Sequence, residues 1–200
     1  MALSVGMTIV STLAAPIMTP FLVYVLAGAW VEVSFWAMVL SVIKVILVPV
    51  LLGILLRSLA GEHVDKVSDV MPLISVIAIV MIIGGIVAVN AEKILSCGVL
   101  VLVVVAIHNF FGMMLGLLVA KIFHVEYSRT TAIAIEVGMQ NSGLAVSLAA
   151  ANFAGNPLAT LPGAIFSVWH NISGSIFASI RRSGAERREK AVGSRKIDFV

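Results

Sequence analysis

The sequence predicts an all-α integral membrane protein, and three observations carry this prediction. Hydrophobic residues make up 60% of the chain and charged residues only 12%, against about 45–50% and about 25% in soluble domains. Six separate stretches are apolar over the length of about 20 residues that a membrane-spanning helix needs. The Lys and Arg residues gather on one side of the membrane that these helices define. Lipid is therefore expected to be the solvent for much of the chain.

The six predicted transmembrane helices are joined by short polar connections, so neighbours in sequence are expected to be antiparallel. The first contains Pro16 and Pro20 and the second contains Pro49. Prolines are tolerated in membrane helices because neighbouring helices can satisfy the carbonyls that they free. The six stretches cover residues 2–27, 34–57, 71–90, 95–122, 130–153 and 160–180.

The positive residues predict the orientation of these helices. With the C-terminus in the cytoplasm, eleven of the 13 Lys and Arg residues, Lys66 among them, fall on the cytoplasmic side and Lys93 falls on the opposite side. Lys44 lies inside a predicted span. We expect a transmembrane region over residues 1–182 and a basic cytoplasmic tail over residues 183–200. The basic residues from Arg181 onward are expected to set the topology and to contact anionic lipid head groups.

Composition also limits the class of protein. The net charge of +3 is not spread over one face, so the sequence does not indicate a nucleic-acid partner. Cys97 is the single cysteine, which excludes an internal disulfide and a multi-cysteine metal site. A membrane-embedded enzyme is a minor alternative, because no Asp lies in any predicted span and no HExxH motif occurs. His108 and His170 fall on different helices without an obvious serine or acid partner.

The fifth predicted span is interrupted by polar residues: positions 136–143 read Glu-Val-Gly-Met-Gln-Asn-Ser-Gly. A carboxylate at membrane depth is costly unless it is paired or hydrated, so Glu136 is expected to face a cavity, a cation or a partner. Gly138 and Gly143 lower the local helix preference, and we expect the helix to break between Glu136 and Gly143. A broken helix exposes carbonyls before the break, which suit Na⁺ beside a carboxylate, and N–H groups after it, which suit an anion.

Structural interpretations of the same residues stay open. Glu136 is also compatible with a carboxylate that is protonated or paired within the helix bundle. Gln140, Asn141 and Ser142 are also compatible with hydrogen bonds between helices. Gly84 and Gly85, and the glycines that bound the run Gly112–Gly116, are expected to permit close packing of helices.

The segment 136–143 closely resembles the signature of the bile acid:sodium symporter family, including its bacterial members. Residues 162–174 resemble the last transmembrane helix of that family, and residues 2–5 with 11–16 resemble its fifth. The resemblance extends from Ala2 to about Ala178. With the basic, cysteine-poor composition, it implies a multi-pass protein of a bacterial inner membrane.

The resemblance implies a carrier with ten helices in two inverted repeats of five, divided into a panel domain and a core domain. On this plan the chain supplies the fifth helix and the second repeat. Panel helices would lie at about 34–90, and core helices at about 2–27 and 95–180. The chain would then be truncated at its N-terminus. The missing N-terminal half becomes an expected partner, besides an organic-anion substrate and membrane lipids.

The resemblance also implies roles for single residues. Sodium ligands would be Ser4, Thr8, Glu136, Val137, Met139 and Gln140. Val137 and Met139 would act through their carbonyls. Substrate contacts would come from Asn141, its neighbour Ser142, His170 and Asn171. Ser4 and Thr8 are spaced i, i+4, which puts both hydroxyls on one helix face, although such hydroxyls often bond to the preceding turn. His170 is equally compatible with a polar residue at a helix interface.

These observations predict a symporter that couples Na⁺ to an organic anion such as a bile acid, pantoate or a related carboxylate. No metal other than sodium is expected. The alternative is a truncated, non-transporting fragment or subunit that needs the missing helices, because the ion site implied by this chain holds only part of the family's ligands.

Overall fold

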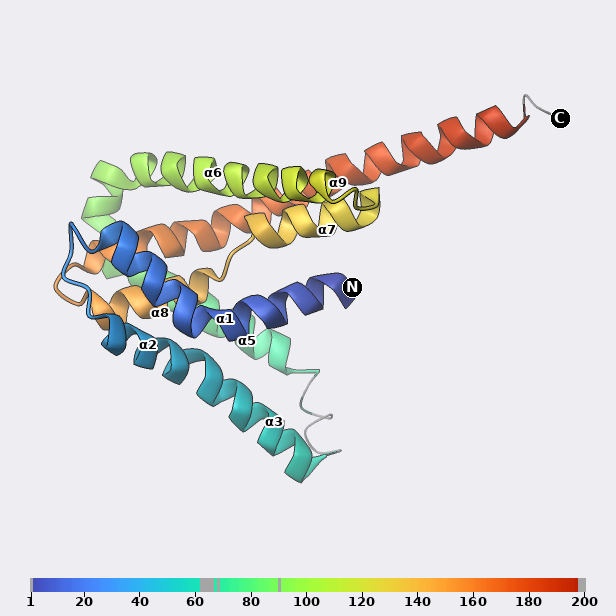
Figure 1. Ribbon diagram of the computed structural model, residues 1–200. Helices are drawn as coiled ribbons and strands as arrows, with labels where there is room; N and C mark the ends of the chain where they lie inside the picture. The colour runs from blue at the N-terminus through green and yellow to red at the C-terminus, as the bar shows by residue number, and fades with distance from the viewer. Residues whose placement is uncertain (1, 62–66, 68, 90, 198–200) are drawn as a thin grey trace. The chain divides into compact units, whose positions relative to one another are not determined.

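The computed structural model describes residues 2–61, 67, 69–89 and 91–197, and the regular secondary structure in these residues is helical (Figure 1). Lys66, the end of the third predicted span at Asn90, and positions 198–200 of the predicted tail lie outside the described residues. In chain order the elements are α1 (Ala2–Ala27), α2 (Phe35–Val42), the π-helical turn η1 (Ile43–Leu47), α3 (Val48–Ala60), α5 (Met71–Val89), α6 (Ala91–Ile122), α7 (Tyr127–Gly138), α8 (Ser142–Asn152), the 3₁₀ turn η2 (Pro157–Thr160) and α9 (Leu161–Ile197).

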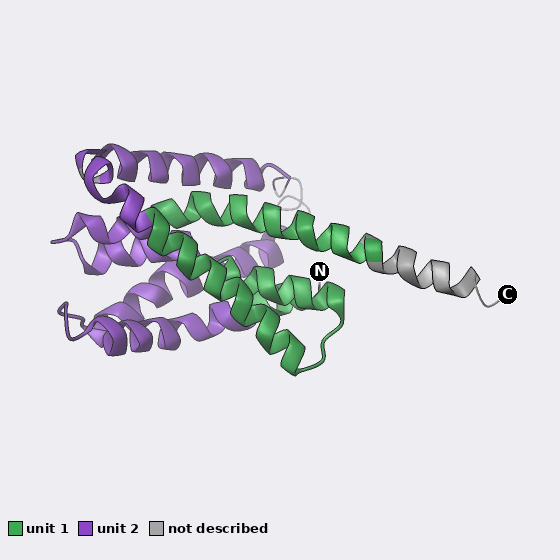
Figure 2. Cartoon of the chain, turned by 90° about the horizontal axis from the view of Figure 1, so that it is seen from above, with its two compact units in different colours: residues 1–8, 102–140, 165–200 green, residues 9–101, 141–164 purple. Residues whose placement is uncertain are grey.

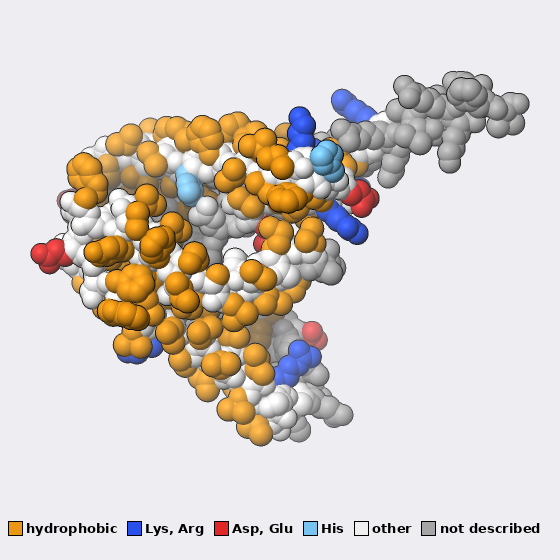
Figure 3. Space-filling model, viewed as in Figure 1, with side chains coloured by type: hydrophobic (Ala, Val, Ile, Leu, Met, Phe, Trp, Pro, Cys, Tyr) orange, Lys and Arg blue, Asp and Glu red, His pale blue; other side chains and the backbone are white. Residues whose placement is uncertain are grey.

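Four helical segments are long and apolar enough to cross a membrane: Leu3–Ala27, Phe35–Ala60, Met71–Val89 and Ile94–Ile122. They match the first four predicted spans, and the all-α membrane class is confirmed. The fifth predicted span forms two shorter helices, α7 and α8. The sixth predicted span lies within α9. Polar residues such as His170 and Asn171 lower its mean hydropathy, so it is not among the four apolar segments. Hydrophobic side chains are exposed over most of the helices in view in Figure 3, as lipid-covered surface requires.

Prolines are accommodated in the first two spans without ending the helices. Pro16 and Pro20 lie inside the unbroken α1. Pro49 has no N–H to donate and its ring crowds the carbonyl four residues earlier. The π-helical turn η1 comes directly before α3, where a wider turn can absorb this conflict. The helix therefore continues from α2 through η1 into α3.

The chain folds into two compact units (Figure 2). Unit 1 contains residues 1–8, 102–140 and 165–200, which are the start of α1, most of α6, α7 and most of α9. Unit 2 contains residues 9–101 and 141–164. The boundary falls at the break between α7 and α8, so the two halves of the fifth span belong to different units. The division into panel and core domains stays a prediction.

In unit 1, α6 and α7 approach each other backbone to backbone. A methyl group added at Gly116 would lie 2.7 Å from the Cα of Ala134, and one at Gly112 would lie 3.0 Å from the carbonyl oxygen of Val137. The predicted close packing at positions 112–116 is therefore confirmed. At Gly84 and Gly85 an added methyl group would meet no atom within 4 Å among the described residues. The expectation for positions 84–85 is not met there, because α5 buries none of its described residues.

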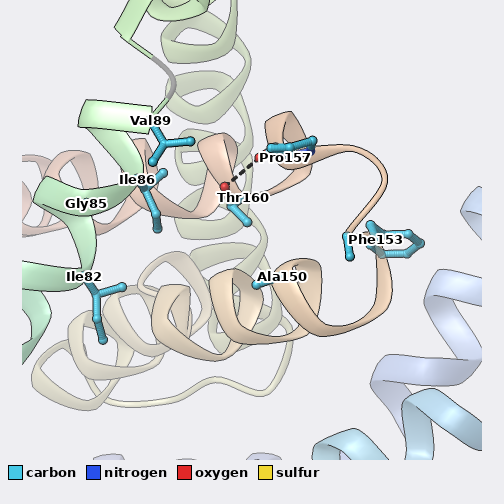
Figure 4. A pocket seen from close by; sticks show the side chains of 9 residues that line it. Ile82, Gly85, Ile86, Val89, Ala150, Phe153, Pro157 and Thr160 are labelled. Atoms are coloured by element: carbon cyan, nitrogen blue, oxygen red, sulfur yellow. Dashed lines mark hydrogen bonds between the residues drawn. The ribbon is translucent and has the colours of Figure 1, made fainter.

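Unit 2 has its own apolar core, in which Val42 and Ile46 of the second span pack with Leu148 of α8. One face of α5, the end of α8 and η2 also line an apolar cavity of about 430 Å³ (Figure 4). The hydroxyl of Thr160 in its wall already donates to the carbonyl of Pro157 at 2.8 Å. None of the residues predicted to bind an ion or a substrate lines this cavity.

We predict that Gly116→Ala destabilises the protein, because its methyl group can be accommodated only if α6 and α7 move apart. Overpacking of this kind costs about 1–3 kcal/mol. The matched control Gly85→Ala places a methyl group in open space, and better helix propensity should stabilise it by up to about 1 kcal/mol. Thermal unfolding in detergent, followed by circular dichroism, measures both. Equal stability of the two variants would contradict the proposed backbone contact.

Candidate functional site

Glu136 lies in the last turn of α7, and two hydroxyls from the start of α1 donate hydrogen bonds to its carboxylate. Ser4 Oγ donates to Oε1, and Thr8 Oγ1 donates to Oε2 at 3.0 Å. All three residues belong to unit 1. Hydrogen bonds to an ionised carboxylate are stronger than neutral ones, and they offset the cost of removing the charge from water. The i, i+4 spacing on α1 thus brings both hydroxyls to one carboxylate.

The Thr8 hydroxyl also donates to the Ser4 carbonyl oxygen at 3.0 Å. This is the hydrogen bond to the preceding helical turn that the sequence predicts as the structural alternative for such hydroxyls. A hydroxyl carries one proton and two lone pairs, so Thr8 divides its proton between two acceptors. Two hydroxyl oxygens and two carboxylate oxygens meet here. Hard oxygen ligands of this kind suit hard cations, and they suit Na⁺ where unwound carbonyls lie nearby.

The predicted break in the fifth span is confirmed at residues 139–141. Met139 follows the last residue of α7 with extended backbone (φ −91°, ψ 109°), and its N–H still donates to the Ile135 carbonyl at 2.7 Å. The glycine that ends α7 does not adopt a left-handed conformation, since Gly61 and His124 are the described residues with positive φ. Gly138 instead allows a close approach: a side chain there would collide with Met113 of α6.

Asn109 of α6 takes part in the break, and its contact agrees with the structural role at a helix interface that the sequence favours for His108 and Asn109. Its side-chain amide donates to the Gly138 carbonyl at 2.8 Å, and the residue is only 2% exposed. The available signal was an amide inside an apolar helix, three residues before Gly112. The two predicted carbonyl ligands flank Gly138 in the chain. The Val137 carbonyl lies beside Gly112, and the side chain of Met139 lies against Gly174. Gln140, the last predicted ion ligand, is exposed within the break.

The predicted substrate residues fall in both units. Asn141 and Ser142 belong to unit 2. The Asn141 side-chain oxygen accepts a hydrogen bond from the Leu144 N–H at 2.9 Å and so caps α8. Among the residues that the structure describes, the Asn141 NH₂ group donates no hydrogen bond, and the side chain is exposed. Ser142 is 8% exposed, and a methyl group at Gly163 would lie 3.4 Å from its carbonyl oxygen. This position fits the interpretation of Ser142 as a packing residue.

His170 and Asn171 lie on α9 in unit 1. The His170 ring stacks edge-to-face on Phe166 at 5.2 Å, and Phe166 does the same with His108 at 5.9 Å. Within the described residues, the buried Nδ1 of His170 has no hydrogen-bond partner. Such atoms are rare in folded proteins and call for an explanation, for example a ligand. The Asn171 NH₂ group donates to the Ser167 carbonyl one turn earlier at 2.7 Å.

Arg181 of α9 contacts the start of α7 through a cation–π interaction and hydrogen bonds. Its guanidinium lies 3.7 Å from the centre of the Tyr127 ring, and its Nε donates to the Thr131 hydroxyl at 3.0 Å. In return, the Tyr127 hydroxyl donates to the Arg181 carbonyl at 3.1 Å. The first of the basic residues that were expected to contact lipid thus also bridges two helices of unit 1.

Comparison with known proteins relates the whole chain to sodium-dependent carriers. The family model described as the sodium bile acid symporter family matches residues 1–97. An uncharacterized sodium-dependent transporter of Bacillus subtilis, YocS, is 45% identical over 198 residues, which are 99% of this chain. A probable chloroplastic sodium/metabolite cotransporter of rice, BASS1, is 42% identical over 182 residues, 91% of this chain. The Arabidopsis protein of the same name is 40% identical over 187 residues, 94% of this chain.

These relatives are longer than the region they share with this chain. The chain covers 61% of the Bacillus protein, 45% of the rice protein and 46% of the Arabidopsis protein. The residues of the broken helix lie outside the segment matched by the family model but inside the segments matched by the relatives.

We predict that Arg181→Lys destabilises unit 1 although it keeps the positive charge. Lysine has neither the flat guanidinium that stacks on Tyr127 nor the forked donors that reach α7. The expected loss is about 1–2 kcal/mol of unfolding free energy. The matched control is Arg187→Lys on the exposed part of α9, which should change stability by less than about 0.5 kcal/mol. Thermal unfolding in detergent tests both, and equal effects would refute the bridging role.

Proposed function

We propose that this chain is a member of the sodium bile acid symporter family, whose model matches residues 1–97, and that it carries the ion-binding helices of a symporter that couples Na⁺ to an organic anion. The family is one of sodium-coupled transporters rather than enzymes, which sets the enzyme alternative aside. The chain is a multi-pass membrane protein. A bacterial inner membrane and a cytoplasmic C-terminus are part of the proposal.

The observation that carries this proposal is the cluster formed by Ser4, Thr8 and Glu136 beside the broken helix. Na⁺ would bind where the carboxylate and the two hydroxyl oxygens meet, helped by the carbonyls of Val137 and Met139 and by the Gln140 side chain. The positive ion offsets the carboxylate charge at membrane depth, which lipid cannot do. Binding of Na⁺ would therefore stabilise one arrangement of the break, and this is how it would prepare the substrate site.

The anion would bind at the start of α8. The Asn141 oxygen caps the helix, and its NH₂ group donates to none of the described residues. The positive end of the α8 dipole favours an anionic group. Ser142 is a further predicted contact beside Asn141. In unit 1, the Nδ1 of His170 has no hydrogen-bond partner among the described residues, which supports a separate ligand-binding role for this ring, with Asn171 as its predicted neighbour. A bile acid, pantoate or a related carboxylate would meet these requirements. Alternating exposure of the site to the two sides would complete transport.

A second candidate is supported by the greater length of the relatives. The chain would act as a subunit, and a partner would supply further helices and further ion ligands. Intact mass spectrometry of the protein from its native host separates the two candidates. A mass well above 21.1 kDa favours a single longer carrier, whereas that mass with a co-purifying membrane chain favours a subunit.

We predict that Glu136→Gln abolishes sodium-dependent uptake, because the amide keeps the shape of the side chain and removes the charge that the cation neutralises. The measurement is uptake of radiolabelled carboxylates into cells or proteoliposomes, in Na⁺ and in K⁺, using the native-host form of the protein. The matched control is Glu126→Gln. The Glu126 Oε2 lies 3.8 Å from the Arg129 Nε, and both side chains are exposed. Because this carboxylate is outside the proposed ion site, the variant should transport normally. Sodium-stimulated uptake at the wild-type level in Glu136→Gln would contradict the proposal.

We predict that Asn141→Asp separates capping from substrate binding. The aspartate oxygen can still accept the Leu144 N–H and cap α8, so the variant should be as stable as the wild type. It lacks the NH₂ donor and adds a negative charge, so the substrate KM should rise at least about tenfold, the change expected from losing a hydrogen bond to a charged group. Unfolding and uptake assays measure the two effects. An unchanged KM would remove Asn141 from the substrate site.

A further inference from the structure

We propose that Asn109 of α6 is a positioning residue for the ion site: its amide occupies the Gly138 carbonyl, and α6 thereby sets the direction of the remaining carbonyls at the end of α7. The proposal rests on the proposed function, because it concerns the same ion site. Asn109 itself is not assigned as a sodium ligand.

The end of α7 presents more acceptors than its own backbone can satisfy. The last four carbonyls of a helix have no partner within the helix. In α7, the Ile135 carbonyl accepts from the Met139 N–H at 2.7 Å and the Gly138 carbonyl accepts from Asn109 at 2.8 Å. In the part of the chain that the structure describes, the carbonyls of Glu136 and Val137 accept no hydrogen bond from the residues after the break. Asn109 thus fixes the Gly138 carbonyl and leaves the neighbouring carbonyls of Glu136 and Val137 open to an ion.

Asn109 differs from Asn152 and Asn171 in the helix to which its side-chain amide donates a hydrogen bond. Asn152 and Asn171 donate to carbonyls four residues earlier in their own helices, which satisfies the amide without affecting a second helix. Asn109 is buried, and it reaches a carbonyl 29 residues away on α7. A buried amide costs stability unless it is bonded. Its hydrogen bond therefore resists any displacement of the end of α7 from α6.

Asn109 shares one face of α6 with Gly112 and Gly116, at i, i+3 and i+7. We call these three residues the α6 seam. The two glycines hold α7 at backbone distance, with Gly112 beside the Val137 carbonyl. A carbonyl oxygen has two lone pairs, so the Val137 carbonyl can lie against Gly112 and still accept a cation. The position of the Val137 carbonyl then depends on α6. A substitution in the α6 seam should therefore change the Na⁺ concentration that gives half-maximal stabilisation more than it changes the maximal stabilisation by Na⁺.

The test compares Asn109→Leu with the matched control Asn152→Leu in the full chain in detergent. Thermal stability is titrated with NaCl against KCl at constant ionic strength. For Asn109→Leu the Na⁺ concentration giving half-maximal stabilisation should rise about tenfold, the change expected from losing one buried hydrogen bond, with the maximal stabilisation preserved. Asn152→Leu should keep the wild-type midpoint. A midpoint within twofold of the wild type in Asn109→Leu, or an equal rise in the control, overturns the proposal.

Hydrogen exchange provides a readout that does not depend on sodium. Without Na⁺, the amides of residues 136–139 should exchange faster in Asn109→Leu, while those of residues 144–146 in α8 stay unchanged. Unchanged exchange at the end of α7 overturns the positioning role. If the wild type shows no sodium response, this chain does not hold the ion by itself, as the subunit candidate predicts, and the exchange result alone then decides whether Asn109 positions the helix end. Should Asn109→Leu not fold, Gly112→Ala is the milder variant, and it should change the same two readouts in the same directions.

Discussion

A carboxylate within a membrane-spanning helix has to be paired or hydrogen-bonded, because lipid offers it no partner. In this protein the group is Glu136, and its partners are the hydroxyls of Ser4 and Thr8, which lie more than a hundred residues earlier in the chain. This requirement joins the start of α1 to the end of α7, and both belong to unit 1, whereas the rest of α1 belongs to unit 2. The same contact collects the hard oxygens that an alkali cation needs.

The half-helix α7 is held at three places within unit 1. At its start, Arg181 of α9 stacks on Tyr127 and bonds to the α7 backbone. Along its side, Gly116 of α6 allows its backbone to approach. At its end, Asn109 donates to the Gly138 carbonyl, and the hydroxyls of α1 donate to the Glu136 carboxylate. A helix of 12 residues would be marginal in isolation, so its position depends on these tertiary contacts.

The two sides of the break have different chemistry. The residues proposed to bind Na⁺ all lie in unit 1, where carboxylate, hydroxyl and carbonyl oxygens dominate. The residues proposed to bind the anion are divided: Asn141 and Ser142 begin α8 in unit 2, and His170 and Asn171 lie in unit 1. Acceptors at the end of one half-helix and donors at the start of the next follow from backbone polarity alone. A single helix break thus offers a site that favours a cation and a site that favours an anion within a few residues of the chain.

The sequence by itself determined the membrane class, the first four spans and the break near residues 136–143, because these depend on local hydropathy and on polar residues at membrane depth. It also placed Ser4 and Thr8 on one helix face, since helical periodicity needs no tertiary information. Only the tertiary structure decided that Asn109 satisfies the Gly138 carbonyl, that Gly138 makes room for Met113, and that Arg181 bridges to α7. Each of these is a contact between helices distant in sequence, and the spacing of residues within one helix contains no information about which neighbour it meets.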